Sequence, residues 1–395
     1  MAEQSWASER VKDIPFSSIR VIFDEAKRLE AMGRKVYHME IGRPDFDTPA
    51  HIKEAAVKAL SEGIVHYTAS AGFPEVCQAI AEKLKRDNGL TYDPAGEVML
   101  TPGVKYAVYC IMQGLLNPGD EVLLPDPCWL DYFHCVRLAG GVPVSIPLRE
   151  ELGFQLDPKE VEALITPRTK ILVIITPHNP TGTVLAKETL AELADLAARR
   201  NLLVVSDEIY EKLIYDGATH HSFAGFPGMW ERTLTLNGFS KAYAMDGWRL
   251  GYIAAPRSLV QPILKVQMYG VANVTSFAQF GAIAAYRGPQ DCVTRMVAEF
   301  DRRRRMMYAA MAEMAGLRCH RPQGAFYFFP NVKAFGLSSL DMSTYLMREA
   351  GLATVPGSAF GQWGEGYIRL AYSDSFENLQ EAMERMKEAL AKLRR

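Results

Sequence analysis

The chain has 395 residues, of which 48% are hydrophobic and 23% charged, and its formal net charge is −2 at pH 7. This length favours more than one domain around a sizeable core. The near-neutral charge argues against a nucleic-acid-binding surface, which needs a clustered basic excess. No apolar run reaches the roughly 18 residues of a membrane span, and no signal peptide is visible. The six cysteines show no metal-binding spacing, so we predict reduced thiols, no metal and a cytoplasmic protein.

The N-terminal part contains a helical pattern over residues 17–32, an extended piece over 35–41 and a helix over 51–61. From about residue 97, short apolar runs alternate with helical patterns such as 104–116 and 187–200. The runs predicted to be strands are residues 98–101, 121–125, 142–147, 170–176, 202–207, 233–237 and 250–254. Apolar strands separated by helices predict an α/β fold with a mostly parallel seven-stranded sheet sandwiched by helices.

Beyond residue 287 the order changes to a long helix over 289–315, three short strands and a terminal helix, which predicts a smaller α+β domain. The three strands are expected at residues 324–330, 354–356 and 367–372. We therefore divide the chain into an N-terminal arm with part of the small domain (1–50), a large domain (51–287) and a small C-terminal domain (288–395). The basic run Arg302–Arg305 is predicted to be a solvated helix face beside acidic neighbours, Glu299 and Asp301.

Lys241 and Arg249 lie in one segment, NGFSKAYAMDGWRLG, which follows an apolar run ending at Leu236. A lysine amine near another cation has a lowered pKa and can form a Schiff base with an aldehyde. An arginine is suited to binding a phosphate dianion. An aldehyde and a phosphate on one small molecule describe pyridoxal 5′-phosphate. The segment resembles the S-K-x-x-x-M-x-G-W-R-x-G signature of the class I/II pyridoxal-phosphate aminotransferases, which have fold type I, and the resemblance extends from about residue 15 to the C-terminus.

Four more motifs follow predicted strands, where ligands collect in open parallel sheets. They are TPGVK at 101–105, DPCW at 126–129, HNPTG at 178–182 and DEIY at 207–210. Each also has a structural interpretation: a strand–glycine–helix turn, an aromatic ring packed at a rim, a polar turn and a helix N-cap.

For the phosphate, the resemblance implies binding by the turn Gly103–Lys105 and by Arg249. A glycine at a helix N-terminus lets backbone amides approach an anion. Val104 cannot supply the hydroxyl that relatives use, so its amide and the Lys105 side chain are the candidates. Gly238 stands where many relatives have a phosphate-binding serine, and Ser240 is a possible replacement.

For the pyridine ring, the resemblance implies that Trp129 stacks on one face and Ile209 packs on the other. Asn179 and Tyr210 are expected to hydrogen-bond the phenolic oxygen. Asp207 is expected to keep the ring nitrogen protonated, which makes the ring an electron sink.

For the substrate, Arg369 lies among apolar residues in a predicted strand, where an isolated arginine needs an anion. An internal acid is one possible partner. The resemblance instead implies a bidentate clamp on the substrate α-carboxylate, with Asn179 and the loop glycine Gly42 beside it, although Arg43 replaces the usual acidic residue. It also implies a homodimer in which Tyr67 reaches the neighbouring cofactor phosphate.

The predicted function is therefore an aminotransferase in which Lys241 binds the cofactor and moves a proton from the substrate Cα. The family works by ping-pong transfer between an L-amino acid and a 2-oxo acid, usually 2-oxoglutarate. Because fold-type I enzymes also catalyse other reactions, a lyase or cyclase, for example a C–S β-lyase, remains an alternative. A further alternative is a module that binds the cofactor without catalysing a reaction.

The substrate pocket is the least determined part of the prediction. After Lys265, the segment up to Gln279 contains no arginine or lysine that could bind a second carboxylate. Candidate pocket walls are hydrophobic: Ile14, Phe16, Ile19, Tyr269 and Phe277. We therefore favour an aromatic or broad-range amino acid as donor, with aspartate close behind.

Overall fold

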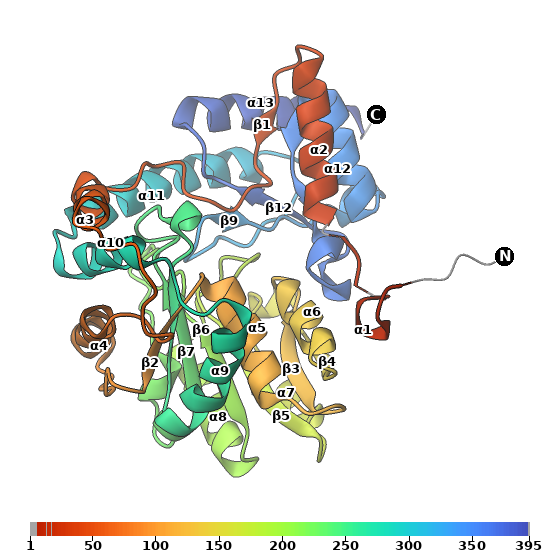
Figure 1. Cartoon of the computed structure of the whole chain (residues 1–395). Helices are drawn as coiled ribbons and strands as arrows, with labels where there is room; N and C mark the ends of the chain where they lie inside the picture. Colours follow the sequence, from red (N-terminus) through yellow and green to blue (C-terminus); the bar gives the residue numbers. More distant parts are fainter. Residues whose placement is uncertain (1–5, 13, 17, 394–395) are drawn as a thin grey trace.

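The computed structural model describes residues 6–12, 14–16 and 18–393, with residues 18–21 described by their backbone alone. All seven predicted strands form one sheet (Figure 1). In spatial order they are β2 (Val98–Thr101), β8 (Gly251–Ala254), β7 (Thr233–Gly238), β6 (Leu203–Asp207), β5 (Thr169–Ile175), β3 (Glu121–Asp126) and β4 (Val142–Pro147). β8 runs antiparallel to β2 and β7, whereas β7, β6, β5, β3 and β4 are successively parallel. The mostly parallel sheet is thus confirmed.

Helices cover both faces of this sheet because the strand residues alternate between two apolar cores. Val122 and Leu124 of β3 belong to the core that includes residues of α5 (Val104–Leu115), α6 (Asp131–Leu138) and α9 (Arg257–Gly270). Leu123 belongs to the core on the other face, with residues of α7 (Pro158–Ala163) and α8 (Lys187–Arg199). A third core lies at the β2–β8 edge and joins α3 (Ala50–Ser61), α4 (Pro74–Asn88) and α10 (Ser276–Arg287).

The smaller domain lies above the carboxyl ends of the parallel strands in Figure 1. Its elements after residue 290 are α11 (Asp291–Ala312), β9 (Tyr327–Phe328), α12 (Ser339–Ala350), β10 (Leu352–Ala353), β11 (Val355–Pro356), β12 (Ile368–Ala371) and α13 (Phe376–Lys392). β11, β12 and β9 form an antiparallel sheet.

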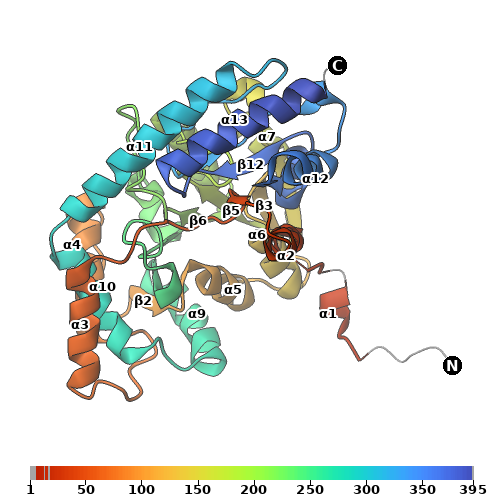
Figure 2. The ribbon, with the colours of Figure 1, turned by 90° about the horizontal axis from the view of Figure 1, so that it is seen from above.

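N-terminal elements also lie in this upper part, as Figures 1 and 2 both show. β1 (Tyr37–His38) pairs in parallel with β10, and α2 (Ser18–Ala31) packs near the same strands. The short helix α1 (Glu9–Lys12) lies at the periphery of the molecule, near α6. The domain boundaries at residues 50 and 287 stay predictions.

The prediction of a solvated basic face on α11 is wrong for two of its four arginines. Arg304 is completely buried, where it bonds Asp216 (2.8 Å) and Asp301, and Arg303 is 5% exposed and bonds Asp45 at 2.7 Å. Four consecutive residues turn through a full circle of an α-helix, so they cannot all face solvent on a helix that buries one side. Acidic neighbours do pair with the run, as expected.

No helix in the described part of the chain combines the length and apolar character needed to cross a bilayer. All six cysteines are free thiols, four of them buried and two, Cys292 and Cys319, partly exposed. Reduced cysteines that belong mainly to the core agree with the sequence prediction.

Candidate functional site

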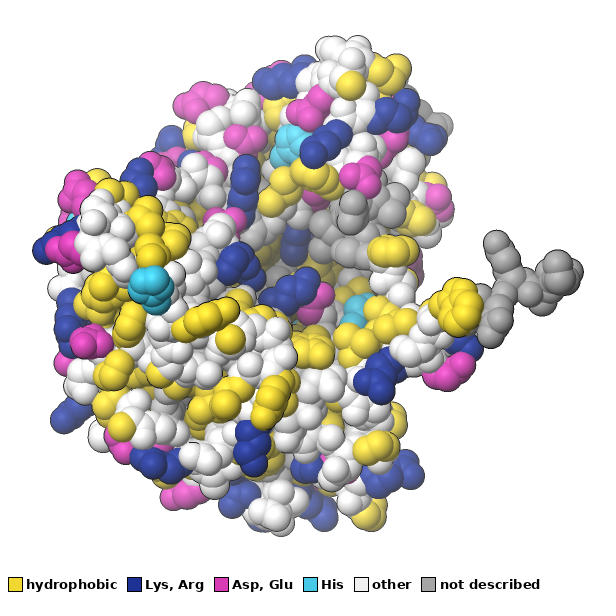
Figure 3. All heavy atoms as spheres, in the orientation of Figure 1, with side chains coloured by type: hydrophobic (Ala, Val, Ile, Leu, Met, Phe, Trp, Pro, Cys, Tyr) yellow, Lys and Arg dark blue, Asp and Glu magenta, His cyan; other side chains and the backbone are white. Residues whose placement is uncertain are grey.

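The predicted motifs meet at the carboxyl edge of the parallel strands, beneath the smaller domain. Five strand ends contribute: β2 leads to Gly103, β3 to Trp129, β5 to Asn179, β6 to Asp207 and β7 to Lys241. Figure 3 shows a hollow between the two parts of the molecule, with Lys and Arg side chains inside it. This is the position at which open α/β sheets bind ligands.

Lys241 lies in the loop directly after β7, and its ammonium group is turned inward. Its Nζ donates a hydrogen bond to the backbone carbonyl of Gly42 and lies 5.9 Å from the ring centroid of Tyr210. Burial lowers the pKa of Lys241 to about 8, and although Asp246 opposes this shift, Arg369 and other nearby cations add to it. A lysine with this pKa is neutral in an appreciable fraction of molecules near pH 7, as a nucleophile or general base requires.

Asp207 ends β6 and is buried. Its carboxylate accepts hydrogen bonds from the hydroxyl of Tyr132 (2.8 Å) and from the backbone N–H of Ile209 (3.2 Å). Burial raises the pKa of Asp207 to about 6, while the Tyr132 hydrogen bond acts in the opposite direction. Among the described residues no cation forms an ion pair with Asp207, so its buried carboxylate is suited to pairing with a cationic ring nitrogen.

Tyr210, which follows β6 of the main sheet, contacts Tyr327 on β9 of the smaller domain. Their hydroxyl oxygens are 2.7 Å apart, and burial raises the pKa of both phenols. A Cβ added at Gly42 would lie 2.3 Å from the Tyr327 hydroxyl. A side chain at this position would therefore displace either the loop or the ring of Tyr327.

Arg369 on β12 is 3% exposed and forms no ion pair with any carboxylate that the structure describes. Its guanidinium donates to the carbonyl of Glu40 (2.6 Å) and to the side-chain oxygen of Asn179 (3.2 Å), whereas its Nε has no hydrogen-bond partner. The rings of Tyr327 and Phe360 flank it at 4.5 and 4.9 Å. A buried guanidinium with an unused donor is a site for an anion, and the alternative of pairing with an internal acid is not found among the described residues.

The turn at Gly103 places the N-terminus of α5 beside Arg249. No side chain caps this helix, which leaves its first amides available for an anion. Gly103 has φ +80°, and a Cβ there would lie 2.6 Å from Nη2 of Arg249. A glycine is therefore required at this turn. The free amides at the start of α5 and the guanidinium of Arg249 lie side by side there and are suited to binding an anion.

Lys105 and Ser240 are the two remaining residues that the sequence analysis named for the phosphate. The ammonium of Lys105 pairs with Asp131 at 2.7 Å and lies 5.6 Å from the ring centroid of Trp129, so its contact with phosphate stays a prediction. At Gly238 a Cβ would lie 2.8 Å from the carbonyl oxygen of Leu250. The strands approach too closely for a serine there. A role for Ser240, which is 9% exposed, stays a prediction.

Comparison with known proteins identifies the family to which the chain belongs. The family described as aminotransferase class I and II matches residues 34–386. The chain belongs to this family. It is 44% identical over 385 residues to an aromatic-amino-acid aminotransferase 2 of Thermococcus litoralis, covering 97% of this chain and 98% of that one. It is 45% identical to an aspartate aminotransferase of Pyrococcus abyssi, with 97% and 98% covered. A crystal structure of the Pyrococcus horikoshii aromatic aminotransferase has a TM-score of 0.89 and 44% identity, covering 93% of this chain and 99% of that one.

The predicted family and fold are thus confirmed, and the chain is an aminotransferase with pyridoxal phosphate as cofactor. The residues present fit this cofactor. The uncapped helix and Arg249 fit a phosphate, the buried Asp207 fits a pyridine nitrogen, and the inward-facing Lys241 fits an aldehyde. The role of each residue is developed below as a proposal.

Two site residues were missed by the sequence analysis. Tyr132 lies three positions after Trp129, on the first turn of α6, where that spacing could have identified it as facing the same site. Tyr327 lies in a predicted strand of the smaller domain, and no local signal indicates that its hydroxyl meets Tyr210.

The predicted pocket walls do not enclose a pocket within one chain. Phe16 is 93% and Tyr269 91% exposed, and Phe277 packs against the core at α3, α4 and α10. Ile14 is partly exposed, and the side chain of Ile19 lies outside the described residues. Hydrophobic character alone could not place these residues, because exposed loops also present such side chains to partner subunits.

Proposed function

We propose that this aminotransferase exchanges the amino group of an aromatic or broad-range L-amino acid with a 2-oxo acid, 2-oxoglutarate being the expected acceptor, by a ping-pong mechanism. The observation that carries the proposal is the buried Arg369, whose Nε has no hydrogen-bond partner, at the same domain junction as the inward-facing Lys241. The guanidinium of Arg369 fits the carboxylate common to all amino acids and 2-oxo acids. The amine of Lys241 fits the transfer of the proton at Cα.

The cofactor is held from two sides. The backbone amides of Gly103 and Val104, the amide and ammonium of Lys105, and the guanidinium of Arg249 bind the phosphate at the start of α5. Trp129 and Ile209 pack on the ring faces. Bound pyridoxal phosphate supplies an aldehyde for the amino group and a ring that accepts electron density from Cα.

Three side chains set the charge around the ring. Asp207 carries the negative charge that keeps a ring nitrogen protonated, and Tyr132 holds its carboxylate in place at 2.8 Å. Tyr210 and Asn179 donate hydrogen bonds to the phenolic oxygen.

Lys241 has two tasks in this proposal. It attaches the cofactor covalently at rest, and once released its neutral amine moves the proton of the substrate Cα. Burial supports both, because it lowers the pKa of Lys241 to about 8 and so increases the neutral fraction of its amine.

The substrate carboxylate is expected at Arg369, with Asn179 and the loop at Gly42 around it. Burial among the rings of Tyr327 and Phe360 removes competing water, so a bidentate pair formed there is stronger than one at the surface.

The identity of the side-chain pocket is supported by the relatives rather than by one residue here. One relative is named for aromatic amino acids and the other for aspartate, at 44% and 45% identity. An apolar pocket discriminates by only about 1–3 kcal/mol per methylene, so several donors are expected to react. Aspartate is the second candidate.

A homodimer completes the proposal. Apolar side chains stay exposed on α3, on the loop after it, and at the end of α9 and its C-cap: Val57, Leu60, Val65, Tyr67, Met268, Tyr269 and Val271. Hydrogen bonds from Gln267 to Ser70 and from Ser276 to Ile64 hold these segments side by side, and Figure 3 shows hydrophobic side chains over this part of the molecule. We infer that a second copy covers this surface and that Tyr67, 90% exposed in one chain, reaches the partner's phosphate site.

A panel of amino donors with 2-oxoglutarate tests the substrate proposal. We expect phenylalanine, tyrosine and leucine to react with kcat/KM values within about two orders of magnitude of one another. Aspartate exceeding all of them by several orders of magnitude would make aspartate the substrate. Free ammonia released in proportion to 2-oxo acid would identify the lyase alternative instead. The cytoplasmic location, supported by the free cysteines, is checked by fractionating cells that express the protein.

A further inference from the structure

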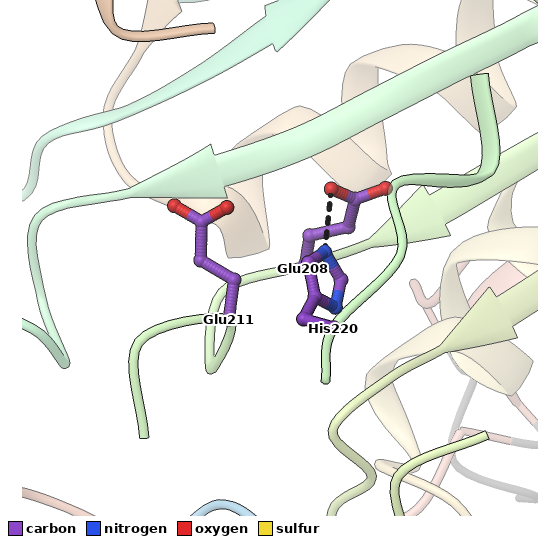
Figure 4. A group of neighbouring side chains, drawn as sticks. All are labelled: Glu208, Glu211 and His220. Atoms are coloured by element: carbon purple, nitrogen blue, oxygen red, sulfur yellow. Dashed lines mark hydrogen bonds and ion pairs between the residues drawn. The ribbon is translucent and has the colours of Figure 1, made fainter. Parts of the chain in front are cut away.

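The segment from Asp207 to Glu211 presents two sets of side chains. Asp207 and Tyr210 belong to the site described above. Glu208 and Glu211 instead enter a buried cluster away from it, together with His220 (Figure 4). Both glutamates are buried, with side-chain exposures of 0% and 7%.

Glu208 is held by four donors. Its Oε1 accepts from the Ser206 hydroxyl (2.8 Å) and the Phe223 amide (3.2 Å), and its Oε2 accepts from the Ser222 hydroxyl (2.6 Å) and His220 Nε2 (3.0 Å). A carboxylate satisfied at both oxygens is fixed in position. Glu208 follows Asp207 in the chain. Fixing the side chain of Glu208 therefore restricts the backbone of Asp207.

Glu211 ties the same segment to α4. Its Oε1 forms an ion pair with Lys83, whose side chain is 1% exposed, and its Oε2 accepts from Asn88 at 2.8 Å. Asn88 also donates to Ser222 at 2.7 Å, which links the Glu211 and Glu208 groups into one network. The backbone N–H of Glu211 donates to the carbonyl of Glu208, 2.9 Å away, and closes the turn between them.

Two carboxylates and a histidine at this spacing could hold a metal ion, but their bonding gives another use. Each carboxylate oxygen already accepts from a protein donor, and Lys83 supplies a positive charge inside the cluster. Both carboxylates are therefore satisfied by protein donors, whereas Nδ1 of His220 has no hydrogen-bond partner among the described residues.

We propose that Glu208 and the Lys83–Glu211 pair are positioning residues that fix Asp207 and Tyr210 against the pyridine ring. The inference rests on the proposed roles of Asp207 and Tyr210. The hydrogen bonds of the network connect the segment to α4 through Lys83 and Asn88, and to the loop at 220–223. The Glu208 charge also acts on Asp207, since after burial it adds to the rise in the pKa of that carboxyl.

Glu208→Gln is the direct test, because it keeps the shape but places an NH2 group among donors. We expect the cofactor dissociation constant of the apoenzyme to rise at least tenfold. The pH midpoint of the cofactor absorbance should shift and kcat should fall, while KM for the amino acid changes less than threefold because Arg369 and Asn179 are untouched. The wild type is measured beside it. If the wild type does not transaminate, the proposed function fails rather than this inference.

Lys83→Met/Glu211→Gln is the second variant, since it removes the buried pair without leaving one charge alone. The matched control is Lys212→Ala, which removes a partly exposed ion pair with Asp87 (2.7 Å) that joins the residue following this segment to the same helix, α4. Loss of thermal stability in the first two variants, with cofactor affinity and absorbance midpoint equal to those of the control, would show a merely structural network and overturn the proposal.

Discussion

The guanidinium of Arg369 donates to the side-chain oxygen of Asn179 across 3.2 Å. Arg369 belongs to β12 of the smaller domain, and Asn179 follows β5 of the main sheet. The contact therefore places the candidate substrate site at the junction of the two domains, where neither domain alone provides it.

Changing Arg369 should affect substrate binding more than folding. Arg369→Lys keeps a positive charge but loses the two parallel donors, so we expect KM for both amino acid and 2-oxo acid to rise about tenfold to a hundredfold. Steady-state kinetics measure this. Arg305→Lys, at a position 63% exposed on α11, is the control and should leave KM unchanged. An unaltered KM in Arg369→Lys would remove Arg369 from the substrate site.

The stability of the apoenzyme should depend on pH through Asp207. Its pKa rises from 3.8 to about 6 on folding, so the folded chain binds this proton more tightly than the unfolded chain. The contribution to stability is fully present below about pH 4 and is lost as pH rises through 6, with a size of about 3 kcal/mol. Urea unfolding of wild type and Asp207→Asn from pH 4 to 7 should diverge by this amount. Parallel curves would show that Asp207 does not titrate in this range.

Tyr67 tests the dimer. We expect Lys241→Ala and Tyr67→Ala proteins to be nearly inactive alone. Denatured together and refolded, they should recover about a quarter of wild-type activity, because half of the dimers are mixed and each mixed dimer has one intact site. Sedimentation measures the dimer independently. A fully active monomer would contradict the proposal, as would a mixture no more active than its components.

Gly238 should not tolerate any side chain. A Cβ there would lie 2.8 Å from the carbonyl oxygen of Leu250 and 2.9 Å from the Cα of Gly251, and neither backbone can move freely within the sheet. Gly238→Ala should therefore destabilise the protein by roughly 1–3 kcal/mol in urea unfolding. Gly225→Ala is the control, since its added Cβ would lie 3.9 Å from Leu90. Equal stability of the two variants would refute the close approach.

Much of the fold and site could be predicted because the relevant signals are local. The apolar run before Lys241 is a strand, and its polar residues come after the strand end, so the edge at which Asp207, Asn179 and Lys241 meet follows from sheet topology. Residues whose role depends on distant partners could not be placed. Arg304 is buried because Asp216 approaches it from another part of the chain, and Tyr327 reaches Tyr210 only after the domains pack.

Lys105 is a residue of the candidate site whose contacts could not be predicted from the sequence. Its position after Gly103 favours a phosphate contact, whereas in the structure its ammonium pairs with Asp131 on the neighbouring helix α6. Sequence spacing gives the place of its Cα, but the direction of a long, 61% exposed side chain depends on the charges around it.

The central claim is that Lys241 is the residue that carries the cofactor, and borohydride reduction tests it most directly. Reduced holoenzyme is digested and its peptides are mapped by mass spectrometry, with Lys241→Ala as the control. We predict that the pyridoxyl group is found on Lys241 in the wild type and on no peptide of the variant. Modification of another lysine at equal yield in both proteins would contradict the account.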